Sequence, residues 1–568
     1  MNRQCDSGRK QSGAAGTGRV EAVGRAAGRL QRVVSCLTVA VVAATWLMAC
    51  PALGTGPATI TLLHVNDTHS HLDAWGPKDR HFEGTLGGMA KAATVIARVR
   101  AAEPNVLLLH AGDVFHGDLF FNAYFGVPEL RLMRQLGFDA MAVGNHEFDF
   151  GPAVLAGSLT AAYGDDTLPL LSANLDLSGY PALTTWIRPA LIRDVGGVRI
   201  GIFGMTVPDD VMNMPAPVQI LGAGDPTVLM GIAAQQVGEL RRSGAEVVIC
   251  LSHLGVLYDR AIAANVPGID IIVGGHDHNV FDRPEAVANP EGGPTLILQA
   301  GSHYEYVGRL RFTVDAGKVR VLSYRLLPVD ERVRPLPQVQ SVVDDLERGI
   351  VATYGDVYKL RLATAVCDLE TVTDPDRPER DSAMGDLVTD ALRARTSTDI
   401  AITANGLIDE GIFRGPIVGV DLFRPVSYGY DSATGLGLKI ATLRIAGAEL
   451  IESLEMGLAY LGINEDFFLQ VSGMSFQYDP RAVAGARVRQ ESVRVHGQSL
   501  DPYRIYSVTV NEAIAALLPM MGVDISELQI LPDLEYEVLK DHVVGLHRVD
   551  VRPEGRIVDI SVPRRRHR

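Results

Sequence analysis

Five short apolar segments of this 568-residue chain each end in a motif that can bind a metal ion or move a proton. The motifs are Asn66-Asp67-Thr68-His69, Ala111-Gly112-Asp113, Gly144-Asn145-His146-Glu147-Phe148-Asp149, Ser252-His253 and Gly274-Gly275-His276-Asp277-His278. They contain seven oxygen or nitrogen ligands: Asp67, His69, Asp113, Asn145, His253, His276 and His278. Such a set without a thiolate suits two divalent ions of Zn, Mn, Co or Fe that share one carboxylate. Ions about 3.5–4 Å apart can clamp a phosphoryl group and activate water.

Each motif is weak alone, and the order of the motifs carries the inference. An isolated Gly-Asp or Ser-His pair indicates almost nothing. However, every motif follows a predicted strand, and functional groups in α/β sheets gather just past the carboxyl ends of strands. Eleven of the 15 histidines lie between His64 and His303, which indicates that this part of the chain is the reactive one. We therefore predict a dinuclear metal site.

Five histidines of this part stay outside the ligand set: His64, His71, His110, His116 and His303. His64 and His110 lie within strands and are expected in the core or behind the ligands, whereas His71 and His116 could line the pocket without being ligands.

The segments before the motifs predict the fold that positions them. Apolar β-type runs are expected at 60–65, 106–110, 140–143, 198–203, 247–251, 269–273 and 295–298. Helical patterns, as at 88–100 and 225–242, lie between them. Apolar strands separated by helices predict a layered α/β domain. We place this catalytic domain at 58–330, a linker with a helix at 331–356, a second α/β domain at 357–562 and a basic tail at 563–568.

The two ends of the chain do not read as folded structure. Residues 1–49 combine seven basic residues with an uncharged run from Val33 to Ala49, which is typical of a signal peptide. Leu47-Met48-Ala49-Cys50 resembles a bacterial lipobox, so the chain is expected to be exported to the periplasm or cell surface, with lipidation at Cys50 as one outcome. Ordinary cleavage and an uncleaved anchor are the alternatives. The basic tail is interpreted as a frayed end or a membrane-surface contact.

Charge and cysteine content argue against two other classes of protein, nucleic-acid-binding proteins and disulfide-rich proteins. The formal net charge of −15 argues against nucleic-acid binding through a basic surface. Five cysteines are too few for a disulfide framework. Cys250 lies in an apolar run, which favours a buried thiol, while a Cys250–Cys367 disulfide stays open as the alternative.

The motif set resembles the calcineurin-like metallophosphoesterases, and within them the secreted 5′-nucleotidase family. The resemblance rests on the three longest motifs above, with His64-Val65 before the first, and on Leu86-Gly87-Gly88. It extends over about residues 58–560, strongly in the first domain and partially in the second. It implies a layered α/β sandwich for the first domain and a second α/β domain that reads a nucleotide.

The resemblance also implies roles for individual residues. One ion would be held by Asp67, His69, Asp113 and His278, the other by Asn145, His253 and His276, with Asp113 bridging. His146 would bind no metal and would stabilise charge at the scissile phosphate or help the leaving oxygen depart. Asp149 would orient His146 through its other ring nitrogen. The alternative for Asp149 is a helix N-cap.

The second domain matches the family's substrate-binding pattern incompletely. Arg380 and Asn405 are candidate contacts for the substrate, although Arg380 also fits a solvated position before a helix. Tyr428 could stack on the base, but no second ring is evident. The expected arginine of the Asn-Gly segment is replaced by Glu410, which inverts the charge. The hydrolytic motifs are thus complete, whereas the nucleotide-reading motifs are not.

The sequence therefore predicts an exported dinuclear-metal hydrolase that attacks phosphorus with a metal-bridging hydroxide, most simply on nucleotides. A thiosulfohydrolase of the kind found in bacterial sulfur oxidation and a 2′,3′-cyclic phosphodiesterase are alternatives on the same scaffold. A surface binding protein with a degenerate substrate domain is the alternative from another class. The oligomeric state does not follow from the sequence.

Overall fold

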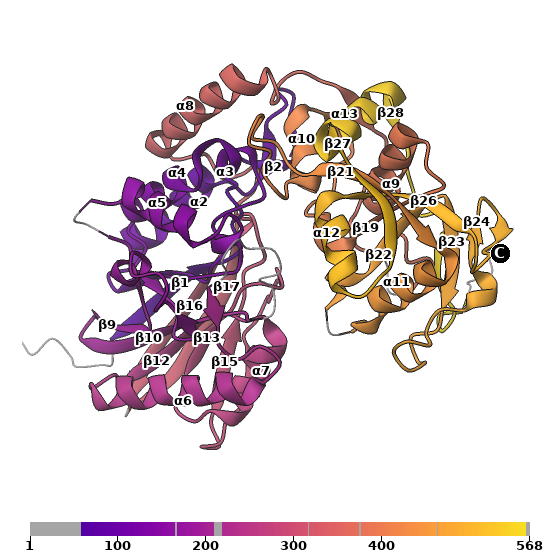
Figure 1. Ribbon diagram of the computed structural model, residues 1–568. Coiled ribbons are helices and arrows are strands. Elements are labelled where there is room, and N and C mark those ends of the chain that lie inside the picture. Colours follow the sequence, from indigo (N-terminus) through magenta and orange to yellow (C-terminus); the bar gives the residue numbers. More distant parts are fainter. Residues whose placement is uncertain are drawn as a thin grey trace, which may run out of the picture. The chain divides into compact units, whose positions relative to one another are not determined.

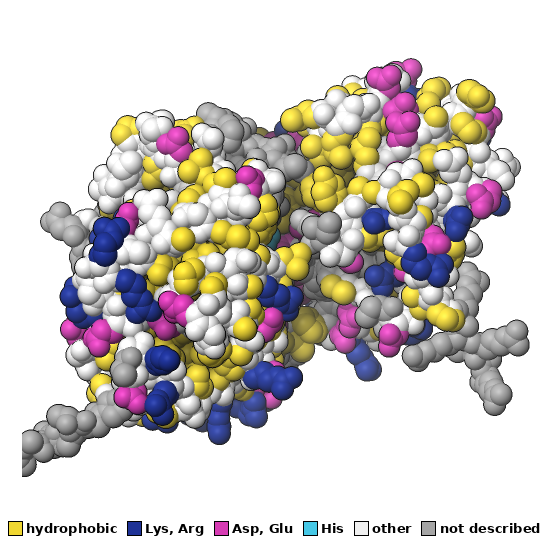
Figure 2. All heavy atoms as spheres, turned by 90° about the horizontal axis from the view of Figure 1, so that it is seen from below, with side chains coloured by type: hydrophobic (Ala, Val, Ile, Leu, Met, Phe, Trp, Pro, Cys, Tyr) yellow, Lys and Arg dark blue, Asp and Glu magenta, His cyan; other side chains and the backbone are white. Residues whose placement is uncertain are grey.

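The structure, a computed structural model, describes residues 58–164, 167–208, 218–315, 317–373, 376–462 and 464–563 (Figure 1). The predicted signal peptide, Cys50 and residues 564–568 of the basic tail lie outside the described residues, so these assignments stay predictions. Within these ranges, no helix has the length and apolar character to cross a membrane. On the face drawn in Figure 2, Lys and Arg side chains lie among acidic and hydrophobic ones.

A seven-stranded sheet forms one layer of the first domain. Strands β1 to β8 of this sheet are parallel, and β16 runs antiparallel to both β1 and β17. In spatial order the strands are β17 (Lys318–Pro328), β16 (Tyr306–Asp315), β1 (Thr59–Val65), β4 (Val106–His110), β5 (Ala140–Ala142), β6 (Leu170–Leu171) and β8 (Ile187–Arg188).

A six-stranded sheet forms the facing layer. Its four central strands are parallel, and both edge strands are antiparallel to their neighbours. In spatial order they are β14 (Glu285–Ala288), β15 (Pro294–Leu298), β13 (Ile271–Val273), β12 (Val247–His253), β10 (Val198–Thr206) and β9 (Ala190–Val195). All seven predicted strands are present in these two sheets, but the long β16–β17 hairpin was not predicted.

The alternation of side chains along the strands builds a separate core on each face of the seven-stranded sheet. Leu62 and Leu107 point into the core between the two sheets, where they meet Ile249 of β12. Their neighbours Leu63 and Leu108 face the opposite way, into the core under the first group of helices. Because successive strand residues point to opposite faces, strands that are apolar throughout can be buried on both sides.

Helices cover both outer faces of the sheet pair (Figure 1). On the side of the seven-stranded sheet lie α2 (Met89–Ala102), α3 (Leu119–Tyr124), α4 (Val127–Gln135) and α5 (Pro152–Ala162). On the six-stranded sheet lie α6 (Pro226–Arg242) and α7 (Val256–Asn265). Helix α6 begins where the Asp225 carboxylate accepts the N–H of Thr227, as an N-cap does. The layered α/β sandwich expected from the sequence is confirmed.

Helix α8 (Pro337–Tyr354) matches the helix expected in the linker and leads into the second domain. That domain is built on a five-stranded sheet in the order β22 (Leu469–Ser472), β19 (Ile400–Ala404), β26 (Ile505–Asn511), β21 (Lys439–Ala446) and β27 (Ile525–Leu534). Its helices are α9 (Ala383–Thr396), α10 (Gly419–Phe423), α11 (Gly447–Ala459), α12 (Glu512–Met520) and α13 (Glu535–Leu546). The second α/β fold is thereby confirmed.

Smaller elements complete the described chain. The remaining strands are β2 (Trp75–Lys78), β3 (Gly84–Leu86), β7 (Leu175–Asp176), β11 (Gln219–Ile220), β18 (Ala363–Ala365), β20 (Gly415–Ile417), β23 (Met474–Tyr478), β24 (Arg494–Val495), β25 (Gln498–Ser499), β28 (Arg548–Val549) and β29 (Ile557–Asp559). Short 3₁₀ turns are η1 (His146–Phe148), η2 (Leu183–Thr185), η3 (Asn405–Leu407), η4 (Arg424–Val426), η5 (Glu465–Phe467) and η6 (Gln490–Ser492). Cys250 and Cys367 are free thiols, so the disulfide alternative is wrong.

Candidate active site

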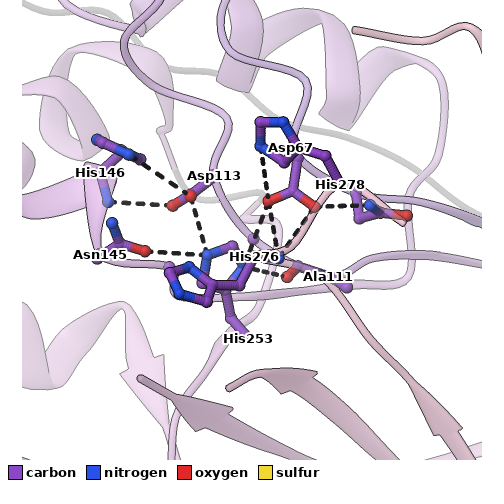
Figure 3. A network of polar contacts seen from close by, with 12 residues as sticks. Asp67, Ala111, Asp113, Asn145, His146, His253, His276 and His278 are labelled. Atoms are coloured by element: carbon purple, nitrogen blue, oxygen red, sulfur yellow. Dashed lines mark hydrogen bonds and ion pairs between the residues drawn. The ribbon is translucent and has the colours of Figure 1, made fainter. Parts of the chain in front are cut away.

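The loops after β1, β4, β5, β12 and β13 meet at one edge of the sheet pair, as their motifs predict (Figure 3). The strands from β1 to β5 are parallel within one sheet, and β12 and β13 are parallel within the other. A direct contact joins the two sheets there, because the ring Nδ1–H of His253 donates to the carbonyl oxygen of Ala111 at 2.7 Å. Parallel strands therefore deliver all five motifs to a common place.

The first group of ligand atoms comes from Asp67, His69 and His278, which lie within 4.8 Å of one another. His69 donates its Nδ1–H to the carbonyl oxygen of Phe115 at 3.3 Å. Its Nε2 then faces Nε2 of His278 at 3.0 Å. The carboxylate of Asp67 is fully buried and accepts the backbone N–H of His276 at 3.0 Å.

The second group comes from Asp113, His253 and His276, again with ligand atoms within 4.8 Å. Since His253 uses Nδ1–H on Ala111, its Nε2 faces the other ligands: it lies 2.9 Å from Oδ2 of Asp113 and 3.1 Å from Oδ1 of Asn145. Figure 3 shows these side chains turned toward one another. All seven residues predicted as ligands are thus brought together.

The contacts between these atoms call for a cation. Burial, followed by the charge of His278, holds the pKa of His69 well below its usual value, so that His69 is neutral and presents a lone pair to His278. At His253, burial alone would lower the pKa, but Asp113 raises it to about 10. A lone pair that faces another lone pair or an oxygen is repelled unless a proton or metal ion lies between them. Imidazole nitrogens with carboxylate and amide oxygens are a donor set that fits divalent metal ions.

His146 lies beside the two groups without belonging to either. Its Nδ1–H donates to Oδ2 of Asp149 at 2.7 Å, and its Nε2 lies 4.0 Å from Oδ2 of Asp113. Burial would lower the pKa of His146, but Asp149 and Asp113 outweigh it and hold the pKa well above its usual value. Asp149 lies at the end of η1, whereas α5 begins after Gly151, so the N-cap alternative for Asp149 is wrong.

Backbone strain is concentrated in the same loops. Five of the seven predicted ligands have positive φ: Asp67 (50°), His69 (45°), Asp113 (56°), His276 (81°) and His278 (56°). Residues other than glycine rarely adopt this region, which costs of order 1–3 kcal/mol each, and such residues cluster at functional sites. The fold therefore holds these side chains in place against a local conformational preference.

Two glycines allow the loops to approach so closely. A Cβ at Gly144 would lie 2.1 Å from Oδ1 of Asp113, and one at Gly112 would lie 2.5 Å from Nδ1 of His253. Both distances are far shorter than van der Waals contact. Only glycine leaves room for these ligands at the two positions.

Glu147 supports the site and was not singled out from the sequence. Its buried carboxylate accepts backbone N–H groups from Gly144 (2.6 Å), Val114 (2.7 Å), Asp113 (3.1 Å) and Phe115 (3.2 Å). These bonds tie the loop after β4 to the loop after β5. The sequence did hold one signal for this role, because Glu147 is a hydrogen-bond acceptor that directly follows His146 in the motif.

The buried histidines of the strands have supporting positions, as predicted. Burial lowers the pKa of both His64 and His110 to about 3, so they are neutral. The N–H of Gly112 donates to Nδ1 of His110 at 3.2 Å, and Nε2–H of His110 then donates to Oγ1 of Thr68 at 3.0 Å. His110 thereby joins the loops after β1 and β4.

His116 connects the His146–Asp149 pair to the second domain. Its ring stacks on His146, with centroids 4.8 Å apart, and packs at a tilt against Tyr428, with centroids 4.2 Å apart. Its Nδ1 lies 3.4 Å from Oδ2 of Asp149, and its Nε2 lies 3.1 Å from Oγ of Ser427. The sequence predicted only that His116 could line the pocket, and the contact of His116 with Ser427 was not predicted.

The three predicted substrate residues fall into two places. Tyr428 lies against His116 and also against His146, with centroids 5.9 Å apart. Asn405 and Arg380 instead lie together through Gln470, whose Nε2–H bonds Oδ1 of Asn405 at 2.9 Å and approaches the carbonyl oxygen of Arg380 at 3.5 Å. The structure thus brings only Tyr428 of the three into contact with the histidines.

Arg424 forms a second buried link between the domains. Its guanidinium donates to Oδ2 of Asp118 at 2.6 Å and to Oδ1 of Asp73 at 2.7 Å. The Arg424 side chain is 2% exposed and that of Asp118 is fully buried. Sequence alone gave no reason to pair residues about 300 positions apart.

Known proteins share both halves of this architecture. Residues 60–280 match the calcineurin-like phosphoesterase family, and residues 363–516 match the 5′-nucleotidase C-terminal domain. The crystal structure of a 5′-nucleotidase precursor from Thermus thermophilus is 31% identical, with a TM-score of 0.77, and the match covers 89% of this chain and all of that one.

Two further relatives extend the match. The trifunctional nucleotide phosphoesterase YfkN of Bacillus subtilis is 28% identical over 89% of this chain, which spans 35% of YfkN. The sulfate thiohydrolase SoxB of Thermus thermophilus has the same fold, with a TM-score of 0.72, 23% identity and coverage of 91% and 99% of the two chains. The chain belongs to the 5′-nucleotidase family of calcineurin-like phosphoesterases and is a metal-dependent hydrolase of phosphoric esters.

Proposed function

We propose that this protein hydrolyses phosphate monoesters of nucleotides with two divalent ions. The observation that carries the proposal is the pair of ligand groups around Asp67 and Asp113, with His146 beside them (Figure 3). His146 is paired with Asp149 at 2.7 Å. A surface binding protein would not require the His146 imidazole, whose Nε2 lies 4.0 Å from Oδ2 of the predicted ligand Asp113.

In this proposal the chain divides its ligands between the ions. One ion would be held by Asp67, His69 and His278 and the other by Asn145, His253 and His276, with Asp113 available to both. Two such ions polarise phosphoryl oxygens and lower the pKa of bound water. The buried N–H contacts of Asp67 and His253 orient these two ligands in advance.

His146 supplies the proton chemistry. Asp149 holds Nδ1–H, so that Nε2–H points to the side where Asp113 lies. The Asp149 and Asp113 carboxylates raise the pKa of His146, which favours the protonated ring. From there it donates a hydrogen bond to the phosphoryl group and stabilises the charge that builds on the leaving oxygen.

Tyr428 is proposed to hold the base, with Arg380 and Asn405 as further substrate contacts. The nucleotide assignment is supported by the names of the relatives, among them the 5′-nucleotidase precursor and YfkN. The likeness to the sulfate thiohydrolase concerns the fold alone and adds no support for a sulfur ester.

Location and domain limits are proposed on the sequence. The leader at 1–49 supports export to the periplasm or cell surface, with lipid attachment at Cys50 as one form of it. The catalytic domain is placed at 58–330, the helical linker at 331–356 and the substrate domain at 357–562.

Product release from a panel of substrates tests the proposal. Phosphate is measured for 5′-nucleotides and an aryl phosphate, nucleoside monophosphate for 2′,3′-cyclic nucleotides, and sulfate for thiosulfate, each with Mn, Zn or Co and with chelator. We expect 5′-nucleotides to be preferred and Tyr428→Ala to raise KM for them but not for the aryl phosphate. Tyr430→Ala is the matched control, because Tyr430 packs on Phe125 and Phe150 instead. Equal activity on all esters, or an effect of Tyr428→Ala on the aryl phosphate alone, would contradict the nucleotide assignment.

A further inference from the structure

Glu410 of the second domain lies against the loops that carry one group of predicted ligands. It follows η3, and its side chain is only 3% exposed. The distances from Oε1 of Glu410 are 2.5 Å to Nε2 of His71 and 3.6 Å to Nε2 of His303. A carboxylate that is buried to this extent is costly unless it is paired. The two histidines are therefore its partners in the first domain.

His71 connects Glu410 to the residue that carries a ligand. The ring of His71 is fully buried, and its Nδ1–H donates to the carbonyl oxygen of His69 at 2.8 Å. One ring nitrogen thus contacts the His69 backbone and the other contacts Glu410. His69 has a φ of 45°, a conformation that residues other than glycine rarely adopt unless their surroundings hold them there. The contact through His71 is one such constraint.

His303 supports the same group of ligands from a second direction. Its ring stacks on His71, with centroids 4.1 Å apart, and packs edge-on against the ligand rings of His69 at 5.7 Å and His278 at 5.9 Å. Its backbone N–H donates to the carbonyl oxygen of Asp67 at 2.8 Å. Together, His71 and His303 contact all three members of the ligand group formed by Asp67, His69 and His278.

The second ligand group is held by other contacts. His253 is oriented by the carbonyl oxygen of Ala111, and the backbone N–H of Asp113 donates to Glu147 of the first domain. The two groups therefore differ in what supports them. A change at Glu410 is expected to act on the group around His69.

A carboxylate at position 410 cannot take the part of the arginine that the family resemblance implies there. Arginine donates hydrogen bonds to anions, whereas a carboxylate only accepts them and repels a phosphate group. The nearby guanidinium of Arg424 does not change this, because it is already bonded to Asp118 and Asp73. The inverted charge thus marks a different role for residue 410.

We propose that Glu410 is a positioning residue, which acts through His71 and holds the loop of His69 in the geometry that binds one of the two ions. The inference rests on the proposed two-ion site. Residues that orient metal ligands from behind matter for binding, and their loss typically costs about 10–100-fold in metal affinity or activity. The second domain thereby contributes to the metal site of the first, in addition to carrying Tyr428.

Stepwise metal binding tests the proposal. The full chain is stripped with chelator and titrated with Zn²⁺ against a chelating dye, which gives two dissociation constants. In Glu410→Gln we expect one constant to weaken by about 10–100-fold and the other to stay at the wild-type value. Lys78→Met is the matched control and should change neither. Lys78 of β2 pairs with Asp421 of α10 at 2.9 Å between the same two domains, with side chains 6% and 14% exposed.

A double-mutant cycle tests the route through His71. His71→Phe keeps a ring against His303 but removes both nitrogens, so it should weaken the same constant. If Glu410 acts through His71, the double variant loses no more affinity than the larger of the two single losses, whereas independent effects would multiply. Glu410→Asp keeps the charge, and its affinity should lie between those of wild type and Glu410→Gln.

Several results would overturn the proposal. They are unchanged constants in Glu410→Gln, equal weakening of both constants, and an equal loss in Lys78→Met. Losses that multiply in the cycle would refute the route through His71. Circular dichroism checks the fold of each variant, and Glu410→Asp and His71→Phe carry the test if Glu410→Gln does not fold. A wild-type chain that fails to bind two ions would instead contradict the proposed function itself.

Discussion

Replacing Arg424 by methionine is expected to destabilise the protein strongly. The substitution keeps most of the side-chain volume and leaves the carboxylates of Asp118 and Asp73 without their partner. Because Arg424 and Asp118 are both at most 2% exposed, water cannot take over the lost contacts. Removing one partner of such a buried pair costs about 3–5 kcal/mol. At roughly 2 °C per kcal/mol for domains of this size, Tm should fall by about 6–10 °C.

A surface pair of similar geometry provides the control. Arg260 bonds Glu285 with two contacts of 2.6 and 2.8 Å, but the Arg260 side chain is 47% exposed. Such pairs contribute about 0–1 kcal/mol, so Arg260→Met should lower Tm by no more than about 2 °C. Both variants are compared by thermal unfolding at one pH and salt concentration. If Arg424→Met loses no more than Arg260→Met, the link between the domains is not the buried ion pair described here.

Three further predictions concern the site and its support. Asp149→Asn should lower kcat by about 10²–10⁴-fold while the zinc content stays at the wild-type value, because His146 loses the anion that holds and charges it; an unchanged kcat would contradict this role. Glu147→Gln should lower Tm, because an amide nitrogen would face backbone N–H groups, and the hydrogen bonds lost there cost about 1–3 kcal/mol of stability. An unchanged Tm would show that the carboxylate is dispensable. Burial raises the pKa of Glu129 to about 7, so the folded state keeps a proton that the unfolded state releases near 4.5, and stability falls as pH rises through that window. The Tm of Glu129→Gln relative to wild type should therefore be higher at pH 8 than at pH 5, and equal differences at both would refute it.

The layered sheets and the convergence of the seven predicted ligands could be anticipated because the information for them is local. A buried parallel strand is a short apolar run, and its functional residue follows directly in the sequence. Asp67 follows β1 and Asp113 follows β4, so that the two lie close together once β1 and β4 are neighbouring parallel strands. His146 and Asp149 are three residues apart, so their pairing could also be anticipated from the local sequence.

Other features depend on contacts that no local pattern encodes. The β16–β17 hairpin was missed because β17 is partly or fully exposed along its length and lacks a continuous apolar run. The nearest partners of Glu410 and Arg424, His71 and Asp118, lie more than 300 residues away in sequence, in the first domain. Glu410 was interpreted as a lost substrate contact, whereas the structure places it in a buried cluster with His71. Arg380 was grouped with Tyr428, although only Tyr428 lies against the histidines.

Metal-dependent hydrolysis of a nucleotide is tested by phosphate release from a 5′-nucleotide with chelator-treated and reloaded protein, with metal content measured on the same samples. We expect no release after chelation, recovery with a divalent ion, and both lower metal content and loss of activity in Asp113→Asn. Release that is unaffected by chelator, or an Asp113→Asn variant with wild-type metal content and activity, would contradict metal-dependent hydrolysis.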